Sequence, residues 1–186
     1  MESILKTGNC RVIAEVGVNH NGSEELAKDL VDAAVSVGAD TVKFQVFSTD
    51  ELVRKDSPKA PYQVLQDSGS RDQRDILRRL ELSRGAIARI SQYAADRDLA
   101  FMATPFDLES LEFLLDEMHQ KEIKIASADA VDHRLLVRAG QSSSYIFLST
   151  GMCSMEEVHR ALASISHGQQ GRSLSDVPLA MKQIRS

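Results

Sequence analysis

Short runs of apolar residues alternate with segments of helical periodicity along most of the chain. The run Val12–Val18 precedes residues 23–38, where apolar side chains recur at the spacing of one helical face. That face contains Leu26, Leu30, Ala33, Ala34 and Val37. Ser23 and Gly38 are residue types that begin and end helices. The pattern predicts a strand that can be buried on both faces, then a polar turn and a helix.

The same alternation continues and gives five strand–helix units in all. The later strands are predicted at Asp40–Val46, Leu99–Pro105, Glu122–Ser127 and Tyr145–Gly151. The later helices include residues 72–82 and 84–97. A third helix is predicted after Asp107, which caps it, and a fourth at 134–139, which Gly140 ends. The last begins with a capping box of Ser154 and Glu157. This alternation is typical of an α/β fold with a parallel sheet.

Two stretches depart from this pattern. Residues 47–70 form a long polar connection, and such a connection in a compact domain is usually functional or mobile. The regular pattern ends after Ile165. We therefore expect one domain at residues 1–165 and an irregular tail at 166–186, in which residues 176–185 could form a short helix.

Composition narrows the function classes. The chain has 186 residues, of which 42% are hydrophobic and 26% charged, as in an ordinary globular domain. No apolar run is long enough to span a membrane, and the N-terminus lacks the apolar core of a signal peptide, so we expect a cytoplasmic protein. The net charge of -5 and the few aromatic residues argue against nucleic-acid binding. Cys10 and Cys153 are expected to be reduced thiols without a catalytic role.

Polar residues gather at the carboxyl ends of the predicted strands. They are Glu15, Asn19 and His20, then Lys43 and Gln45, Thr104, Lys124 and Ser127, and Ser149 and Thr150. Lys43 and Lys124 stand out, because a buried ammonium group must lose its proton or find an anion. Together with the hydroxyls of Thr104, Ser127 and Ser149, they would form a pocket for a phosphate or carboxylate.

Other interpretations of these residues remain open. The two lysines could form structural salt bridges with Glu15, Asp40 or Asp129, or one of them could be a Schiff-base nucleophile. His20 could be an acid, a base or a loop residue bonded to the backbone. The other four histidines are expected to be solvated, and none of them forms a pair with metal-binding spacing.

Seven blocks of sequence resemble the sialic acid synthase family, meaning N-acetylneuraminate synthase and its legionaminic and pseudaminic acid relatives. The blocks are Ile13–Gly22, Gly38–Gln45, Lys59–Gln63, Leu80–Ser83, Ala103–Asp107, Lys124–Ser127 and Leu148–Met152, within residues 10–165. The resemblance implies a TIM-type (β/α) barrel. It also implies condensation of phosphoenolpyruvate with an N-acylated amino-sugar aldehyde, such as N-acetylmannosamine, with release of phosphate.

The resemblance also implies roles for individual residues. The phosphoenolpyruvate contacts would be Lys43, Thr104, Lys124, Ser127 and Ser149. Gln45 would contact the sugar. Glu15 would be the active-site carboxylate that orients water or the aldehyde end.

The chain departs from the family in its second half. The family binds a divalent metal, Mn²⁺ or Mg²⁺, through two histidines on later barrel strands, and nothing in this sequence matches those strands. A TIM barrel needs eight strands and about 250 residues, so five units cannot close one. We therefore expect an incomplete barrel that a homo-oligomer or a complementing chain completes. The alternative is a truncated, non-catalytic phosphoenolpyruvate-binding module or a partner subunit of a split synthase.

Overall fold

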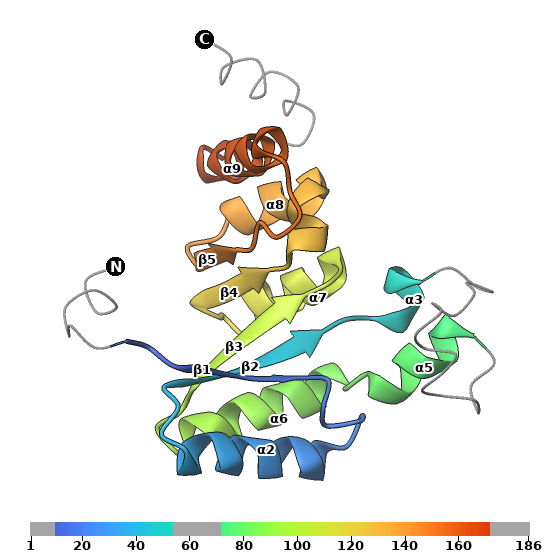
Figure 1. Ribbon diagram of the computed structural model, residues 1–186, viewed down its shortest axis with the longest axis vertical. Helices are drawn as coiled ribbons and strands as arrows, with labels where there is room; N and C mark the ends of the chain where they lie inside the picture. Colours follow the sequence, from blue (N-terminus) through green and yellow to red (C-terminus); the bar gives the residue numbers. More distant parts are fainter. Residues whose placement is uncertain (1–9, 54–71, 172–186) are drawn as a thin grey trace. The chain divides into compact units, whose positions relative to one another are not determined.

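The computed structural model describes residues 10–53 and 72–171 and has an α/β fold (Figure 1). Its five-stranded parallel sheet has the order β1-β2-β3-β4-β5. The strands are β1 (Ile13–Gly17), β2 (Thr41–Val46), β3 (Ala100–Pro105), β4 (Glu122–Ile125) and β5 (Tyr145–Leu148). The predicted fold class and the five strands are confirmed. The chain divides into two compact units, Met1–Met102 and Ala103–Ser186.

The first unit packs two helices against β1 and β2. These are α2 (Glu24–Ser36) and α6 (Arg84–Ala95), which lie side by side in Figure 1. Val42 and Phe44 point into the core between strand and helix, together with Val16, Ala27, Val31, Ala34, Ile90, Ala94 and Leu99. Side chains alternate along a strand, so Lys43 and Gln45 lie on the opposite face of β2.

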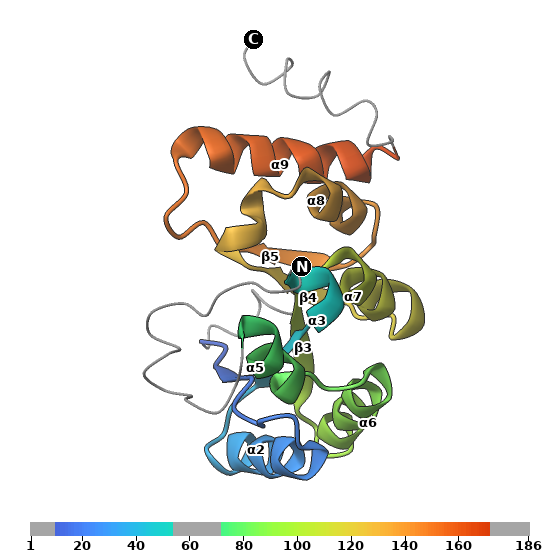
Figure 2. The same ribbon diagram turned by 90° about the vertical axis from the view of Figure 1, so that its right-hand side faces the viewer.

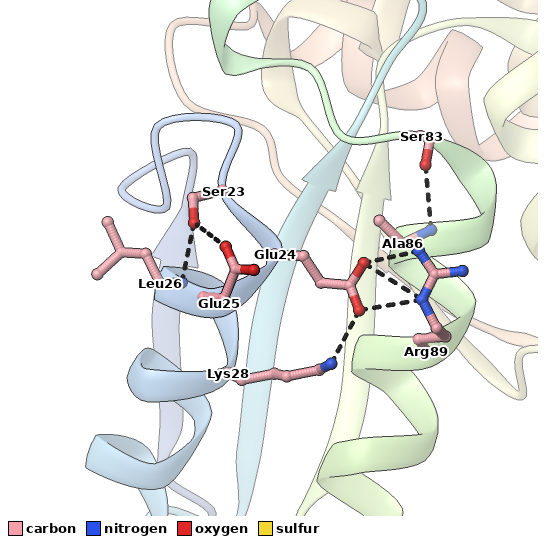
Figure 3. Close-up of polar contacts among 8 residues, drawn as sticks. All are labelled: Ser23, Glu24, Glu25, Leu26, Lys28, Ser83, Ala86 and Arg89. Carbon is pink, nitrogen blue, oxygen red and sulfur yellow. Dashed lines mark hydrogen bonds and ion pairs between the residues drawn. The ribbon is translucent and has the colours of Figure 1, made fainter.

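Local capping explains where α2 and α6 begin. The Ser23 hydroxyl accepts a hydrogen bond from Leu26 N at 3.1 Å, and the Ser83 hydroxyl accepts one from Ala86 N at 3.2 Å (Figure 3). Glu24 joins the two helices through its ion pair with Arg89 of α6 at 2.7 Å, and it also pairs with Lys28 of its own helix at 2.8 Å. These arginine and lysine contacts hold the pKa of Glu24 at about 2.

The described part of the first unit also contains two shorter helices. They are α3 (Thr49–Leu52) and α5 (Gln73–Leu80). Asp50 on α3 pairs with Arg74 and Arg78 of α5, the latter at 2.8 Å, and Thr49 N donates to the Glu81 carboxylate at 3.0 Å. The remainder of the predicted connection, residues 54–70, lies outside the described residues.

The first strand is less buried than the sequence predicted. Val12 and Ile13 are exposed, and so is Glu15. Within the described ranges β1 pairs only with β2, so its other side has no neighbouring strand to cover it. The expectation of burial on both faces was therefore wrong for the beginning of this strand.

The second unit packs its helices against β4 and β5. They are α7 (Leu108–Glu112), a π-helical turn η1 (Phe113–Glu117), a 3-10 turn η2 (Ser127–Val131), α8 (His133–Gly140) and α9 (Met155–Gln169). The core contains Ile123, Ile125, Leu111, Leu115, Leu135, Leu136 and Ala161. The Asp107 cap is confirmed by its hydrogen bond from Ser110 N at 2.7 Å, and the Ser154–Glu157 capping box is confirmed in both directions.

Helices α8 and α9 lie against each other (Figure 2). Two glycines lie at their contact. A methyl group on Gly140 would overlap the carbonyl oxygen of Ile165, and one on Gly168 would overlap that of Val137. Gly140 is the last residue of α8, whose C-cap is Gln141. The helix therefore ends at Gly140, as predicted, although the capping position itself belongs to Gln141. Gly140 has a second role that the sequence did not predict, since it lets α9 approach α8 closely.

The end of the described chain is more regular than predicted. Helix α9 continues to Gln169, four residues past Ile165, because Gly168 packs against α8. His167 is buried on this helix, so the expectation that it is solvated was wrong. The possible helix at 176–185 lies outside the described residues.

Two further expectations can be compared with the described residues. No helix among them is long and apolar enough to cross a membrane. Cys10 and Cys153 are both free thiols.

Candidate functional site

Glu15 and Lys43 form an ion pair on neighbouring strands. The register of the parallel pair places them directly opposite each other, and Glu15 Oε2 contacts Lys43 Nζ. The Lys43 side chain is 11% exposed, whereas that of Glu15 is 50% exposed. Asp40, another partner considered for Lys43, accepts a hydrogen bond from Val12 N at 2.7 Å instead. Among the carboxylates considered, Glu15 is therefore the one that forms a salt bridge with Lys43.

Gln45 lies beside the same carboxylate. A β-bulge between Glu15 and Gly17 shifts the register of β1 against β2. A methyl group on Gly17 would lie 3.4 Å from both Glu15 Oε1 and Gln45 Nε2, so both side chains extend over the bare Cα of Gly17. Bulges commonly redirect side chains near functional sites. The structure thus brings Glu15, Lys43 and Gln45 together within the first unit.

His20 is a buried structural residue of the turn after β1. Its Nδ1 accepts a hydrogen bond from Gly22 N at 3.1 Å, and its ring stacks on Phe44 with 5.9 Å between centroids. Burial lowers its pKa, an effect that the Gly17 backbone partly opposes. Nε2 has no hydrogen-bond partner in the described part of the chain. The loop-residue interpretation fits this position better than an acid or base in contact with solvent.

The second unit contains the other predicted site residues. Thr104, on β3, is buried, and its hydroxyl has no hydrogen-bond partner among residues 10–53 and 72–171. Ser127 begins η2 directly after β4, with its Oγ 3.7 Å from where a methyl group on Gly151 would lie. Ser149 follows β5 and donates its N–H to Ile125 O at 3.0 Å. The ends of β4 and β5 therefore place Ser127 close to the loop that starts at Ser149.

Lys124 lies near Asp129, a carboxylate that the sequence indicated only as its potential partner. Burial raises the pKa of Asp129 to about 6, the negative charge of Asp132 adds to this rise, and Lys124 opposes it. Asp129 Oδ2 is buried and has no hydrogen-bond partner among the described residues. A polar group buried in this way costs folding free energy. The burial of Asp129 had no sequence signal, because the residue lies in a short 3-10 turn outside the strand and helix periodicities.

We expect Asp129→Asn to stabilise the protein above pH 6. The folded chain holds a proton on Asp129 up to about pH 6, whereas an unfolded aspartate releases it near pH 4. Stability from this group is therefore complete below pH 4 and is lost as the pH rises to 6. Allowing for screening at a half-buried site, the gain is about 1 kcal/mol at pH 7.5 and near zero at pH 4.

Urea unfolding at both pH values measures this gain. Asp29→Asn, at an exposed position on α2, makes the same charge change and should show no such pH dependence. An equal effect of Asp129→Asn at pH 4 and pH 7.5 would contradict the prediction.

A divalent metal has no evident place on the described residues. They contain no group of three or more His, Cys, Asp or Glu side chains arranged to hold a metal ion. The residues present here thus do not fit the Mn²⁺ or Mg²⁺ that the resemblance implies, and we assign no chemical step to a metal on them.

Comparison with known proteins identifies the family. Residues 30–176, most of the chain, match the NeuB family. The chain belongs to the NeuB family. This confirms the resemblance drawn from the seven sequence blocks.

Curated NeuB-family relatives are longer than this chain. It is 41% identical over 167 residues to the N,N'-diacetyllegionaminic acid synthase of Legionella pneumophila, covering 90% of this chain and 46% of the relative. It is 39% identical over 151 residues to the synthase of the same name from Campylobacter jejuni, covering 81% and 45%. Human N-acetylneuraminate-9-phosphate synthase is 29% identical, over 79% of this chain and 40% of the relative. The chain thus spans about half the length of these relatives.

Solved structures of the family have the same fold. The N-acetylneuraminic acid synthetase of Leptospira borgpetersenii, solved with citrate, superposes with a TM-score of 0.70 at 24% identity, over 89% of this chain and 55% of that one. A spore coat polysaccharide biosynthesis protein of Bacillus subtilis gives a TM-score of 0.67 at 28% identity, over 90% and 42%. These neighbours have a TIM-barrel-like fold, and the five units of this chain correspond to part of it.

Proposed function

We propose that this chain binds phosphoenolpyruvate as part of a sialic acid-type synthase. The observation that carries the proposal is Lys43, a nearly buried ammonium group on a core strand of a chain that is 41% identical to a legionaminic acid synthase. Phosphoenolpyruvate carries a carboxylate and a phosphate, and lysine ammonium groups and hydroxyls bind both. Lys43, Thr104, Lys124, Ser127 and Ser149 are the residues proposed for it.

The proposed reaction joins phosphoenolpyruvate to an N-acylated amino-sugar aldehyde. The C3 carbon attacks the aldehyde carbon, water adds at C2, and the resulting tetrahedral intermediate expels phosphate to leave a nonulosonic acid. Lysine charges compensate the anionic groups throughout these steps. Gln45 is proposed as a sugar contact, and the half-exposed Glu15 as the carboxylate that orients water or the aldehyde. Both substrates are intracellular metabolites, which favours a cytoplasmic location.

A Schiff-base aldolase is a weaker candidate. A Schiff-base lysine must place its Nζ against the carbonyl carbon of the substrate, whereas Lys43 Nζ contacts Glu15 Oε2 on the neighbouring strand. Anion binding uses the ammonium group as an ion-pair partner, which is the kind of contact that Lys43 already makes.

Phosphoenolpyruvate at about 100 times its Kd should raise the melting temperature of the purified protein by roughly 5–10 °C, since it would bind only the folded chain. Lys124→Met should abolish the rise by removing one of the two ammonium groups. Lys121→Met, at an exposed lysine just before β4, is the matched control and should keep it. A protein without substitutions that shows no shift would count against the proposal.

A second candidate is a binding module or partner subunit that needs another chain for turnover. One observation favours it: residues 10–53 and 72–171 hold no group of three or more His, Cys, Asp or Glu side chains arranged for the metal that the resemblance implies. Phosphate release from phosphoenolpyruvate, N-acetylmannosamine and Mn²⁺ separates the two candidates. Activity of the chain alone supports the synthase, whereas activity only after adding a second copy or a chain with the later strands supports the subunit.

A further inference from the structure

We propose that the Glu15 carboxylate is an internal counter-anion of Lys43. The carboxylate pairs with the Lys43 ammonium group until an anionic ligand displaces the carboxylate. The naming of that ligand as phosphoenolpyruvate rests on the proposed function. The ion pair itself does not, since it is formed within the first unit by two strands of this chain.

The register of β1 and β2 sets up this contact. Glu15 and Lys43 are directly opposite each other, so their side chains leave the sheet on the same face. That face is opposite the one on which Phe44 packs into the core. The carboxylate therefore reaches the ammonium group across one strand spacing.

The two partners differ sharply in their exposure to water. Lys43 has little access to solvent, and a buried ammonium group needs a compensating anion because its loss of hydration is costly. Glu15 is half exposed, so water can hydrate its carboxylate when the contact breaks. Glu15 is thus the partner that can leave the ion pair. The positive charge of Lys43 must then be compensated by the anion that replaces the Glu15 carboxylate.

The bulge at Gly17 keeps the displaced carboxylate nearby. One carboxylate oxygen of Glu15 contacts Lys43, while the other already lies over Gly17 on the side where Gln45 presents its amide nitrogen. A carboxylate that leaves Lys43 can therefore turn toward an amide donor without crossing the sheet. Binding of an anion to Lys43 must break the Glu15–Lys43 pair, and the free energy of that step is lost from the binding free energy. The native Glu15 carboxylate therefore weakens anion binding.

The test compares anion affinity with and without the Glu15 charge. Glu15→Gln keeps the shape of the side chain and can still accept a hydrogen bond from Lys43, but it does not compete as an anion. By isothermal titration calorimetry we expect it to bind both phosphoenolpyruvate and inorganic phosphate about fivefold more tightly, the effect of an ion pair worth about 1 kcal/mol. Lys43→Met should lose this gain, and the double variant Glu15→Gln/Lys43→Met should bind no better than Lys43→Met.

Glu25→Gln is the matched control, because it removes the same charge from an exposed position on α2 and should leave both affinities unchanged. Circular dichroism verifies that each variant is folded, and Glu15→Asp, with a shorter arm, supplies a milder variant that should give an intermediate gain. Equal or weaker phosphate binding by folded Glu15→Gln and Glu15→Asp overturns the inference. If phosphoenolpyruvate binds to no variant while Glu15→Gln still binds phosphate more tightly than the unsubstituted protein, the proposed function is wrong. The inference that Glu15 is a counter-anion of Lys43 is then still supported.

Discussion

Replacing Gly22 with alanine is expected to lower the free energy of unfolding by about 3 kcal/mol. Gly22 has φ of +77°, a conformation that costs an alanine about 1 kcal/mol. The added methyl group would also overlap the backbone carbonyl oxygen of Arg79 and lie 3.2 Å from its carbonyl carbon. Backbone atoms cannot move aside as a side chain can, and such overpacking adds about 2 kcal/mol. Chemical denaturation followed by circular dichroism measures the loss.

Gly38→Ala is the matched control for this substitution. Gly38 also has a positive φ, of +73°, but nothing lies within 4 Å of where its methyl group would be. It should therefore cost only the conformational strain of about 1 kcal/mol. Equal losses at the two positions would show that the contact between the His20–Gly22 turn and the last turn of α5 carries no energy.

Gly140→Ala is expected to destabilise the second unit by about 2 kcal/mol. Its methyl group would overlap Ile165 O and lie 2.9 Å from the Ile165 carbonyl carbon, so α8 and α9 would have to separate. Both helices contribute to the core that covers Ile123 and Ile125, and separation would loosen that core. A melting temperature lower by roughly 4–8 °C is the expected result.

The control for Gly140 is Gly85, which also lies in a helix, α6. A methyl group there would meet only the Arg89 side chain, at 3.3 Å, and that flexible guanidinium can move. Alanine has a higher helix propensity than glycine, so Gly85→Ala should raise stability by about 0.5 kcal/mol. Destabilisation at both glycines would contradict the claim that the α8–α9 contact is what requires Gly140.

The parts of the fold that depend on neighbouring residues could be predicted from the sequence. Ser23 and Asp107 cap their helices through residues three positions away, and the strand runs contain their own periodicity. The end of α8 at Gly140 was predicted, but the packing role of Gly140 was not, because a glycine that ends a helix and a glycine that admits a second helix give the same local pattern. The packing role depends on residue 165, which lies on another helix. The burial of His167 was missed for the same reason.

The candidate site was predictable in its residue types and not in its pairing. A lysine in an apolar strand requires an anion on physical grounds, and Glu15 was one of three candidates. Choosing among them needs the register of β1 against β2, which pairs Glu15 with Lys43. The bulge that follows this pair, between Glu15 and Gly17, also has no sequence signal. Asp129 became notable only when burial left its Oδ2 unpartnered. Within each unit, therefore, the residue types of the candidate site could be predicted from the sequence. Which of these residues pair with each other could be known only from the three-dimensional structure.

The contact between α3 and α5 has a consequence for the local stability of both helices. Asp50 and Thr49 of α3 contact Arg74, Arg78 and Glu81, which lie on or just after α5. Helices of four and eight residues are too short to persist alone in water, so each of the two depends on the other. A substitution that removes the Asp50 carboxylate therefore loosens two helices at once, although it changes only one of them.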